Sequence, residues 1–517
     1  MSLVLAAAAR EAPLPEALRD PACYPHAVAG RVELVETHIS WVLLAGDYAY
    51  KLKKPVRLPF LDFSTLDARR RYCEEELRLN RRTAPELYLE VVPLVRTARG
   101  PAFGAPGEPL DYAVRMRRFP DDALADAMAA RGALGPAEVD AMAEALVRFH
   151  AALPAAAPGD DWGAPARIAA PALGNFDQLA ALGVAPADAA ALEPLRAWTE
   201  GECRRLAPVF EARRAEGRVR ECHGDLHLGN IAFVGGRAMP FDCIEFDPAL
   251  RWNDMASEVA FLVADLLAHA LPWAAWRLLN AWLERTGDYG SVAVLRFYLV
   301  YRAMVRAKVA RLRPDDAAFR RYLRVAQSLA RSAPPALLLM HGLSGSGKTT
   351  LSQALLERLG AVRVRSDVER KRLHGLDAAA RAGAPPGAGI YSEEASRRTY
   401  ERLGALAQGI LGSGWSALVD AAFLKRGQRD ALRALAARLG APCAIVDCVA
   451  PPEELRRRLR ARAALGADAS DADVAVLEDE LRRAQPLAAD EEAIAVRAGG
   501  ADARAAVEAL AARFAAP

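Results

Sequence analysis

Apolar and polar residues alternate or form short runs along the first part of the chain. This pattern predicts five strands, at residues 32–37, 41–45, 48–53, 89–95 and 112–117. Residues 66–82 predict a helix with charges of both signs, and the pattern becomes helical beyond residue 120. Residues 154–170 are rich in Ala, Pro and Gly, which predicts a surface loop before further helices.

The last third of the chain has a different pattern. Short, largely apolar segments of three to six residues predict buried strands, separated by helical segments, at residues 336–341, 362–365, 418–420 and 444–449. Alternating strands and helices of this kind predict a doubly wound parallel sheet. Ala333-Pro334-Pro335 has the composition of a linker, so we expect one domain over residues 1–332 and another over residues 333–517.

Length and composition agree with a multidomain α/β protein. A chain of 517 residues exceeds one ordinary core, and its net charge of +3 favours neither nucleic acid nor membrane as the main partner. The chain has seven cysteines and no CxxC pair, which indicates a reducing compartment. The apolar run at residues 3–9 lacks a preceding basic residue, so we reject a secretory signal. We expect a cytoplasmic protein.

The segment from His223 to Asn230, followed by Asp242, contains the side chains that phosphoryl transfer to a hydroxyl requires. Asp225 can accept the proton of the attacking hydroxyl, and Asn230 and Asp242 can bind Mg²⁺ against nucleotide phosphates. Residues 231–233 and 239–241 predict a hairpin with the turn Gly235-Gly236. Such a hairpin would bring Asn230 and Asp242 to the same end of the site.

A lysine on a strand beside a nucleotide can bind the α- and β-phosphates, and Lys51 is our candidate, with Lys53 second. Both share one face of a strand by their spacing of two residues. On the predicted helix, Glu76 and Glu75 are better candidate partners for this lysine than Glu74. The alternative is that the lysines are exposed on the strand and that the three glutamates form a solvated face.

These residues together resemble the aminoglycoside phosphotransferase family over roughly residues 30–325. The resemblance implies a two-lobed, protein-kinase-like α+β domain with ATP between an N-lobe of about 1–118 and a helical C-lobe of about 119–332. It also implies that Asp225 is the catalytic base and that Asn230 and Asp242 are metal ligands. Members of the family phosphorylate many small hydroxylated molecules, and some proteins with the fold have lost activity. The chain has no glycine-rich loop at its N-terminal side.

A second phosphate site follows the predicted strand at residues 336–341. The segment from Gly342 to Thr349 matches GxxxxGK[ST] between a strand and a helix, so its backbone N–H groups would surround phosphates. Lys348 would reach the β- and γ-phosphates, and Thr349 would bind Mg²⁺. The candidate nucleotide-binding residues here are Gly342, Ser344, Gly345, Ser346, Gly347, Lys348, Thr349 and Thr350.

Other charged residues follow the later strands of this domain. Asp367 is the candidate base for a second acceptor hydroxyl, or alternatively the N-cap of a helix. Asp420 ends an apolar strand and is the candidate acid that reaches the water shell of Mg²⁺. Arg458 and Arg462 lie one helical turn apart and could form an arginine-bearing lid over the transferred phosphate. The alternative for these arginines is a solvated helix.

This domain resembles the small P-loop kinases of the gluconate, shikimate and polynucleotide kinase type, although Ala421-Ala422 replaces a threonine common in relatives. The whole chain resembles a bacterial group that fuses the two domains. The resemblance implies a bifunctional kinase that uses ATP and Mg²⁺ on small hydroxylated substrates. One alternative is a single active kinase with a regulatory P-loop domain. Another is a polynucleotide 5′-hydroxyl kinase, which the aromatic content of 7% disfavours.

Overall fold

The computed structural model describes residues 14–58, 61–331, 333–378, 380, 388–465, 472–492, 495–498 and 503–514. Its contacts divide into a first unit, Met1–Ala164 with Glu211–Glu258, and a second unit, Pro165–Phe210 with Val259–Pro517. The second unit therefore contains several helices that precede residue 333, and it also contains the whole segment after that residue. The domain boundary expected at residue 333 stays a prediction. The apolar run at residues 3–9 lies outside the described residues.

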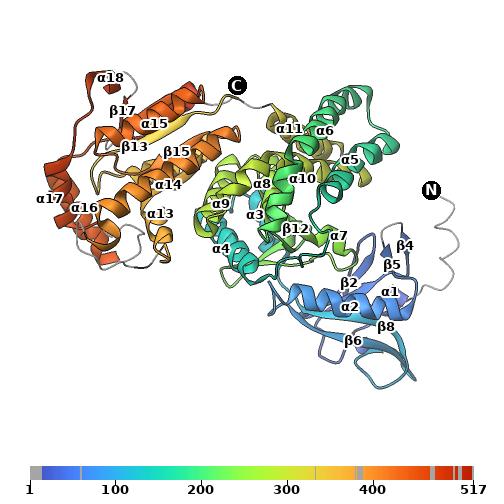
Figure 1. The fold of residues 1–517 in the computed structure, drawn as a ribbon. Coiled ribbons are helices and arrows are strands. Elements are labelled where there is room, and N and C mark those ends of the chain that lie inside the picture. The colour runs from blue at the N-terminus through green and yellow to red at the C-terminus, as the bar shows by residue number, and fades with distance from the viewer. Residues whose placement is uncertain are drawn as a thin grey trace. The chain divides into compact units, whose positions relative to one another are not determined.

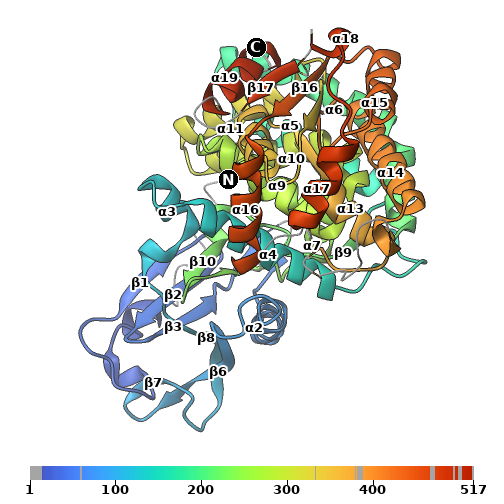
Figure 2. The same cartoon turned by 90° about the vertical axis from the view of Figure 1, so that its left-hand side faces the viewer.

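The first unit contains a six-stranded antiparallel sheet with the order β1-β2-β3-β8-β6-β7 (Figure 2). Its strands are β1 (Glu33–Glu36), β2 (Ser40–Ala45), β3 (Tyr48–Lys53), β6 (Tyr88–Thr97), β7 (Gly100–Phe103) and β8 (Pro109–Arg117). The five strands predicted from the sequence are all present, each within a few residues of its expected ends. Helix α2 (Leu66–Asn80) packs along β8 and β6, beside the sheet in both views of the ribbon (Figures 1 and 2).

The rest of the first unit places the predicted catalytic segment between short strands. Strands β10 (Ile231–Val234) and β11 (Arg237–Pro240) form the expected hairpin, with Val234 paired to Arg237 across the two glycines. Strands β9 (Val219–Glu221) and β12 (Trp252–Asp254) pair nearby. The remaining elements are α1 (Leu14–Ala17), β4 (Arg57–Leu58), β5 (Leu61–Asp62), α3 (Ala125–Ala130), α4 (Pro136–Ala152) and α7 (Pro248–Arg251), and α8 (Met255–Ala268) continues into the second unit.

The second unit contains a five-stranded, all-parallel sheet with the order β14-β15-β13-β16-β17. Its strands are β13 (Leu337–His341), β14 (Val362–Arg365), β15 (Ala417–Asp420), β16 (Cys443–Cys448) and β17 (Ala495–Ala498). A core of leucines and small apolar residues lies between β13, β16 and the helices α12 and α19. The associated helices are α12 (Lys348–Leu359), α13 (Ser366–Leu373), α14 (Glu393–Gly412), α15 (Arg426–Arg438), α16 (Pro452–Leu465), α17 (Val474–Arg483), α18 (Ala489–Glu492) and α19 (Ala503–Phe514).

Helices that precede the sheet in sequence belong to the same unit. They are α5 (Pro165–Leu182), α9 (Pro272–Thr286), α10 (Val292–Leu312) and α11 (Asp316–Ala330), with α6 (Pro186–Ala215) shared between the units. The surface loop expected over residues 154–170 is wrong at its end, because α5 begins at Pro165. Proline suits the first turn of a helix, where its missing N–H would have no helical partner. A helix therefore starts inside a segment whose composition predicted a loop.

The fold class expected from the sequence is confirmed: a kinase-like α+β domain is followed by a P-loop domain with a parallel sheet. All seven cysteines are free thiols, and the reducing compartment expected from the sequence stays a prediction. Among the described residues, no helix combines the length and the apolar character that a membrane crossing requires.

Candidate active sites

The catalytic segment of the first unit is anchored by the buried residues His223 and Glu258. The Glu258 carboxylate accepts the backbone N–H groups of His223 (2.6 Å) and Gly224 (3.1 Å), which fixes the start of the loop. Gly224 has φ 89°, and a Cβ there would lie 2.8 Å from the Leu250 carbonyl oxygen. A glycine is therefore required. Burial lowers the pKa of His223, and its Nε2 lies 2.8 Å from the Phe241 carbonyl oxygen, so this neutral ring links the loop to the hairpin.

Asp225 and Asn230 meet in the turn that follows. The Asp225 side chain is 37% exposed, and its Oδ2 lies 3.5 Å from His227 Nε2. Asn230 Nδ2 donates to the Asp225 backbone oxygen (2.9 Å) and lies 3.4 Å from its Oδ2. The backbone N–H of Phe241 donates to Asn230 O (2.9 Å), so the next residue, Asp242, lies beside the same turn. The hairpin thus carries Asp242 to the same end as Asp225 and Asn230, as the sequence predicted.

Lys51 and Lys53 on β3 form a buried ion network with helix α2. Lys51 Nζ donates to Glu76 Oε1 (2.8 Å) and to Asp242, whereas Lys53 donates to Glu76 and to Glu245. Burial alone would lower the pKa of Lys51, but the charges of Asp242 and Glu76 hold it well above its usual range. Of the two candidate lysines, Lys51 is therefore the one in contact with a candidate metal ligand.

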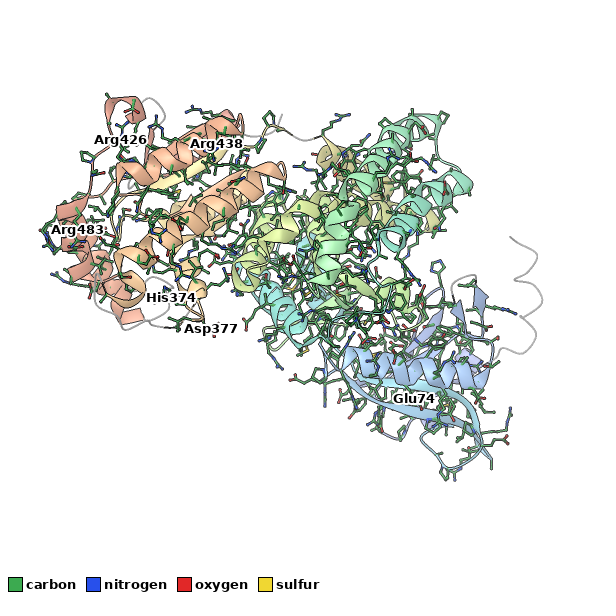
Figure 3. The ribbon with its side chains drawn as sticks, in the orientation of Figure 1. Glu74, His374, Asp377, Arg426, Arg438 and Arg483 are labelled. Atoms are coloured by element: carbon green, nitrogen blue, oxygen red, sulfur yellow. The ribbon has the colours of Figure 1, made fainter. Side chains whose placement is uncertain are left out.

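The three successive glutamates of α2 have different environments. Glu76 is fully buried and Glu75 is half-buried, while Glu74 lies on the exposed face of the helix (Figure 3). Glu75 pairs with Arg78 (2.7 Å) and Arg251 (2.9 Å), and Glu74 pairs with Arg70 (2.9 Å). The choice of Glu76 over Glu74 as lysine partner agrees with this geometry. A solvated face describes Glu74 alone.

The backbone at Asp242 is strained. Its φ of 63° lies in the left-handed region, which non-glycine residues rarely adopt. Its N–H donates to the Tyr88 hydroxyl (3.1 Å), a contact from β6 that the sequence pattern did not indicate. Burial would raise the pKa of Asp242, but Lys51 outweighs it and the pKa is lowered. Asp242 is therefore held ionised, in the state that a metal ligand requires.

His150, at the end of α4, lies among buried groups behind this loop. Ligand-type atoms of His150, Cys222 and Glu258 lie within 4.8 Å of one another. Burial lowers the pKa of His150 to about 3, so its ring is neutral at pH 7. Because the Glu258 oxygens accept the two loop N–H groups, we interpret this cluster as structural.

The phosphate loop of the second unit has the backbone that its motif predicts. Gly342, Gly345 and Gly347 have φ values of 137°, 82° and 95°, and a Cβ on Gly342 would lie 2.4 Å from the Cys448 carbonyl oxygen. Lys348 Nζ donates to the carbonyl oxygens of Gly342 and Leu343, each at 2.8 Å. Thr349 and Thr350 follow at the exposed start of α12.

One buried atom in this loop requires a partner. Ser346 is 7% exposed, and its hydroxyl oxygen has no hydrogen-bond partner within the described part of the chain. A phosphate oxygen bound inside the loop would supply that partner. The positive-φ glycines and this hydroxyl therefore fit a nucleotide phosphate.

Two candidate acids lie near the carboxyl ends of neighbouring strands. Arg365 of β14 is opposite Asp420 of β15, which in turn is opposite Met340 of β13, just before the phosphate loop. Asp420 is 5% exposed, and Ser352 Oγ donates to its Oδ2 (3.0 Å). Asp367 is half-buried in the first turn of α13, whose N-cap is Arg365, so the alternative of an Asp367 N-cap is wrong.

Helices α16 and α17 contact the phosphate loop. Arg458 Nη1 donates to Gly345 O (3.3 Å), which agrees with the expected position of a lid arginine. The side chain of Arg462 lies outside the described residues. Glu480 of α17, which sequence reasoning missed, accepts the backbone N–H of Ser344 (2.7 Å) and its hydroxyl (2.9 Å). Burial raises the pKa of Glu480. No local pattern marks Glu480, because it lies 136 residues beyond its partner.

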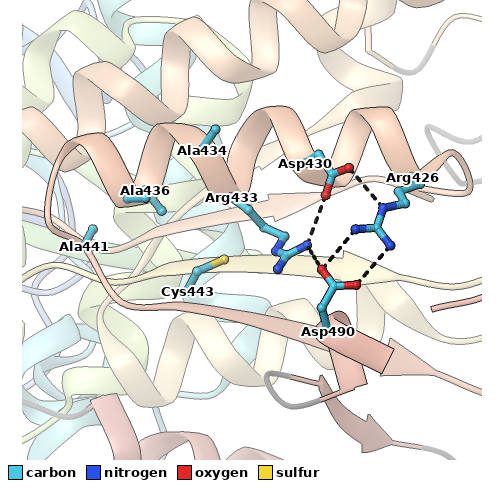
Figure 4. Close-up of a pocket in the computed structure, with 9 residues that line it drawn as sticks. Arg426, Asp430, Arg433, Ala434, Ala436, Ala441, Cys443 and Asp490 are labelled. Carbon is cyan, nitrogen blue, oxygen red and sulfur yellow. Dashed lines mark hydrogen bonds and ion pairs between the residues drawn. The ribbon is translucent and has the colours of Figure 1, made fainter. Parts of the chain in front are cut away.

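The arginines that follow Asp420 make other contacts. Arg426 and Arg433 share Asp490 (3.0 Å each) at a hollow of about 490 Å³ that is lined by residues of α15, by Cys443 and by Asp490 (Figure 4). Arg429 is fully buried against Glu491 (2.6 Å). Because carboxylates already neutralise these guanidinium groups, we interpret all three arginines as structural.

The comparisons with known proteins divide the chain in the same order as the two sites. Residues 60–295 match the family described as "Phosphotransferase enzyme family", and residues 337–487 match the "AAA domain". A choline/ethanolamine kinase family protein from Mesorhizobium loti is similar at 14% identity and a TM-score of 0.36, over 59% of this chain and 90% of that one. A gluconokinase from Sinorhizobium meliloti 1021 is similar at 21% identity and a TM-score of 0.26, over 35% of this chain and 97% of that one.

The fold, the two phosphate-type sites and the family matches define a kinase with two phosphotransferase-type domains, each of a class that uses ATP. Uncharacterized proteins of Mycobacterium tuberculosis and Mycobacterium bovis are 31% identical to it over 461 residues, which is 87% of this chain and 91% of each relative. The chain belongs to the family of these mycobacterial proteins.

Proposed function

We propose that the chain is a bifunctional phosphotransferase that transfers the γ-phosphate of ATP to hydroxyl groups of small molecules at two centres. The observation that best supports the first centre is the contact of Asn230 with Asp225 in one turn, beside the hairpin end that carries Asp242, with Lys51 against Asp242. The glycine cradle from Gly342 to Gly347 supports the second.

In the first centre, Asp225 takes the proton of the acceptor hydroxyl while its oxygen attacks the γ-phosphorus. The bond from that phosphorus to the β,γ-bridging oxygen breaks, and ADP leaves. Lys51, oriented by Glu76, binds the α- and β-phosphates. Asn230 and Asp242 would hold Mg²⁺, which neutralises phosphate charge when bound. The chain mainly positions groups and stabilises charge.

In the second centre, we assign Lys348 to the β- and γ-phosphates and Asp367 to the acceptor proton. Thr349 and Asp420 would hold Mg²⁺ and its water shell, and Arg458 would approach the transferred phosphate. The position of Arg458 beside Gly345 supports the last assignment. The free cysteines support a cytoplasmic location.

A regulatory role for the P-loop domain is a second candidate function, and one observation favours it. Ala421-Ala422 follow Asp420 where similar kinases often have a threonine, which affects the acceptor side of the site and leaves the nucleotide-binding loop intact. In this alternative the P-loop domain binds nucleotide as a sensor, and the first centre alone transfers phosphate.

The test is ATP consumption with product mass for the wild type, Asp225→Asn and Lys348→Ala. The acceptor panel contains sugars, amino sugars, aminoglycosides, nucleosides and 5′-hydroxyl oligonucleotides. We expect two phosphorylated products, each lost in one variant and retained in the other. One product, lost in Asp225→Asn alone, would replace bifunctionality with the sensor function. Loss of both products in either folded variant would refute independent centres.

A further inference from the structure

The edge strand of the parallel sheet is completed by residues that precede residue 333. Strand β14 is the last strand of the sheet on its side. Asn280 of α9 (Figure 1) accepts the backbone N–H of Arg363 (2.7 Å) and donates to Ala361 O (3.0 Å). The Tyr289 hydroxyl donates to Arg363 O (3.2 Å). These side chains replace a neighbouring strand, so α9 is a structural part of the sheet within the second unit.

Two close approaches show how tightly α9 fits against this segment. Gly360, at the end of α12, has φ 67°, and a Cβ there would lie 2.9 Å from the Trp276 ring. Gly287, at the end of α9, has φ 69°, and a Cβ there would lie 2.7 Å from Arg372 Nε. Helix α9 packs directly on α12, the helix that begins at Lys348. A side chain of α9 can therefore reach the strand ends beside the phosphate loop.

Glu284 of α9 does reach them. Its carboxylate binds Arg365 Nη1 through Oε1 (2.8 Å) and Arg363 Nη2 through Oε2 (3.1 Å). Arg365 Nε lies 3.8 Å from Asp420 Oδ2, and Arg363 Nη1 donates to Ser352 Oγ (3.2 Å), which donates to the same Asp420 oxygen (3.0 Å). Glu284 is thus joined to the candidate metal acid by two short routes.

Arg365 lies between Glu284 and Asp420. It is only 12% exposed at its side chain and faces three carboxylates, those of Glu284, Asp420 and Asp367. A buried guanidinium requires an anionic partner. Asp420 lies 3.8 Å from Arg365 Nε, and after Glu284 it is the carboxylate whose charge acts most strongly on Arg365. Without the charge of Glu284, Arg365 would pair directly with Asp420 and compete with Mg²⁺ for it.

We propose that Glu284 is a positioning residue for the P-loop centre, because it holds Arg365 away from Asp420 and leaves that carboxylate available to Mg²⁺ and its water. The proposal rests on the proposed role of Asp420. It means that the second centre uses a residue from helix α9, which precedes the P-loop domain in sequence.

The test measures Mg²⁺-dependent ADP binding by calorimetry in the full chain. Lys51→Ala is the parent, so that binding at the first centre is removed. Glu284→Gln should weaken ADP binding about tenfold in excess Mg²⁺, the loss typical when a residue behind a metal ligand is changed, and less than about twofold in EDTA. The matched control is Glu357→Gln, because Glu357 pairs with Arg277 of α9 (2.8 Å) at the same helix contact. Glu357→Gln should change the ADP affinity by less than about twofold, both in excess Mg²⁺ and in EDTA.

Adding Arg365→Gln to Glu284→Gln separates positioning from structure. If Arg365 captures Asp420, removing the guanidinium should restore most of the Mg²⁺-dependent affinity. Failure of this rescue would overturn the proposal. An equal loss of ADP affinity with and without Mg²⁺ would also overturn it, as would an ADP affinity of Glu284→Gln equal to that of Glu357→Gln. A parent whose ADP affinity does not depend on Mg²⁺ would instead refute the proposed role of Asp420, and the proposal with it.

Discussion

Asn280→Ala tests whether helix α9 is part of the P-loop sheet. The side chain of Asn280 is almost fully buried, and its amide satisfies the N–H of Arg363 and the carbonyl of Ala361 on the edge strand. Alanine leaves both backbone groups buried without these partners. Each such group costs about 1–3 kcal/mol, so the second unit should lose about 2–6 kcal/mol of unfolding free energy.

Two measurements check this loss. For a unit of about 300 residues, an unfolding entropy of about 2.1 cal/mol/K per residue corresponds to about 1.6 °C of melting temperature per kcal/mol, so we expect a decrease of about 3–10 °C. Hydrogen exchange followed by mass spectrometry gives the local measurement, because the amide of Arg363 loses its own hydrogen bond. Its exchange should become at least about tenfold faster, since 1.4 kcal/mol of local opening free energy corresponds to a factor of ten.

The control is Arg277→Gln on the same helix. Arg277 pairs with Glu357 at 2.8 Å, but both side chains are about one-fifth exposed (20% and 22%). An ion pair at such a site contributes about 0–1 kcal/mol, and the variant leaves β14 covered. Unchanged exchange at Arg363 in Asn280→Ala, or a loss of stability no larger than that of Arg277→Gln, would refute the reasoning.

Two further predictions concern single charges. Glu480→Gln should bind ADP and ATP about tenfold more tightly at the P-loop, because it removes a negative charge from the phosphate loop and keeps an acceptor for Ser344. Glu478→Gln on the same helix is the control. Calorimetry measures both variants, and equal nucleotide affinities for the two would contradict the prediction. Burial lowers the pKa of His150 to about 3, so the unfolded chain takes up a proton below about pH 6.5 while the native chain does not. Stability should fall by up to about 1.4 kcal/mol per pH unit as pH decreases through that range. Urea unfolding at pH 7 and pH 5 measures this change. The free energy of unfolding should decrease less for His150→Asn than for the wild type or for His374→Asn.

Local sequence was sufficient for the groups that act on phosphates. The positive φ of Gly342 and Gly347 and the hairpin between Asn230 and Asp242 follow from short-range chemistry, namely glycine conformations and strand pairing. The strand period also placed Lys51 and Lys53 on one face, and both side chains reach Glu76. These features depend on residues a few positions apart, so their pattern is visible in the sequence.

The groups that position those residues could not be predicted in this way. Tyr88 binds the backbone of Asp242 across 154 residues, and Glu284 binds Arg365 across 81 residues. Each is an ordinary residue of a strand or helix, with nothing in its neighbourhood to distinguish it. The start of α5 at Pro165 was missed for a different reason, because proline favours both loops and first helical turns.

These long-range contacts determine how the second centre has to be tested. A fragment of residues 333–517 would lose Asn280, Tyr289 and Glu284 together, leaving the β14 edge without partners and Arg365 without its nearest carboxylate. Such a fragment could bind nucleotide and still fail to transfer phosphate, for a reason unrelated to a sensor role. An exposed strand edge also favours aggregation. Single substitutions in the full chain avoid both effects. Turnover should therefore be measured for Lys348→Ala and Glu284→Gln in the intact protein. This comparison distinguishes a P-loop domain that is inactive from one that has only lost its positioning residue.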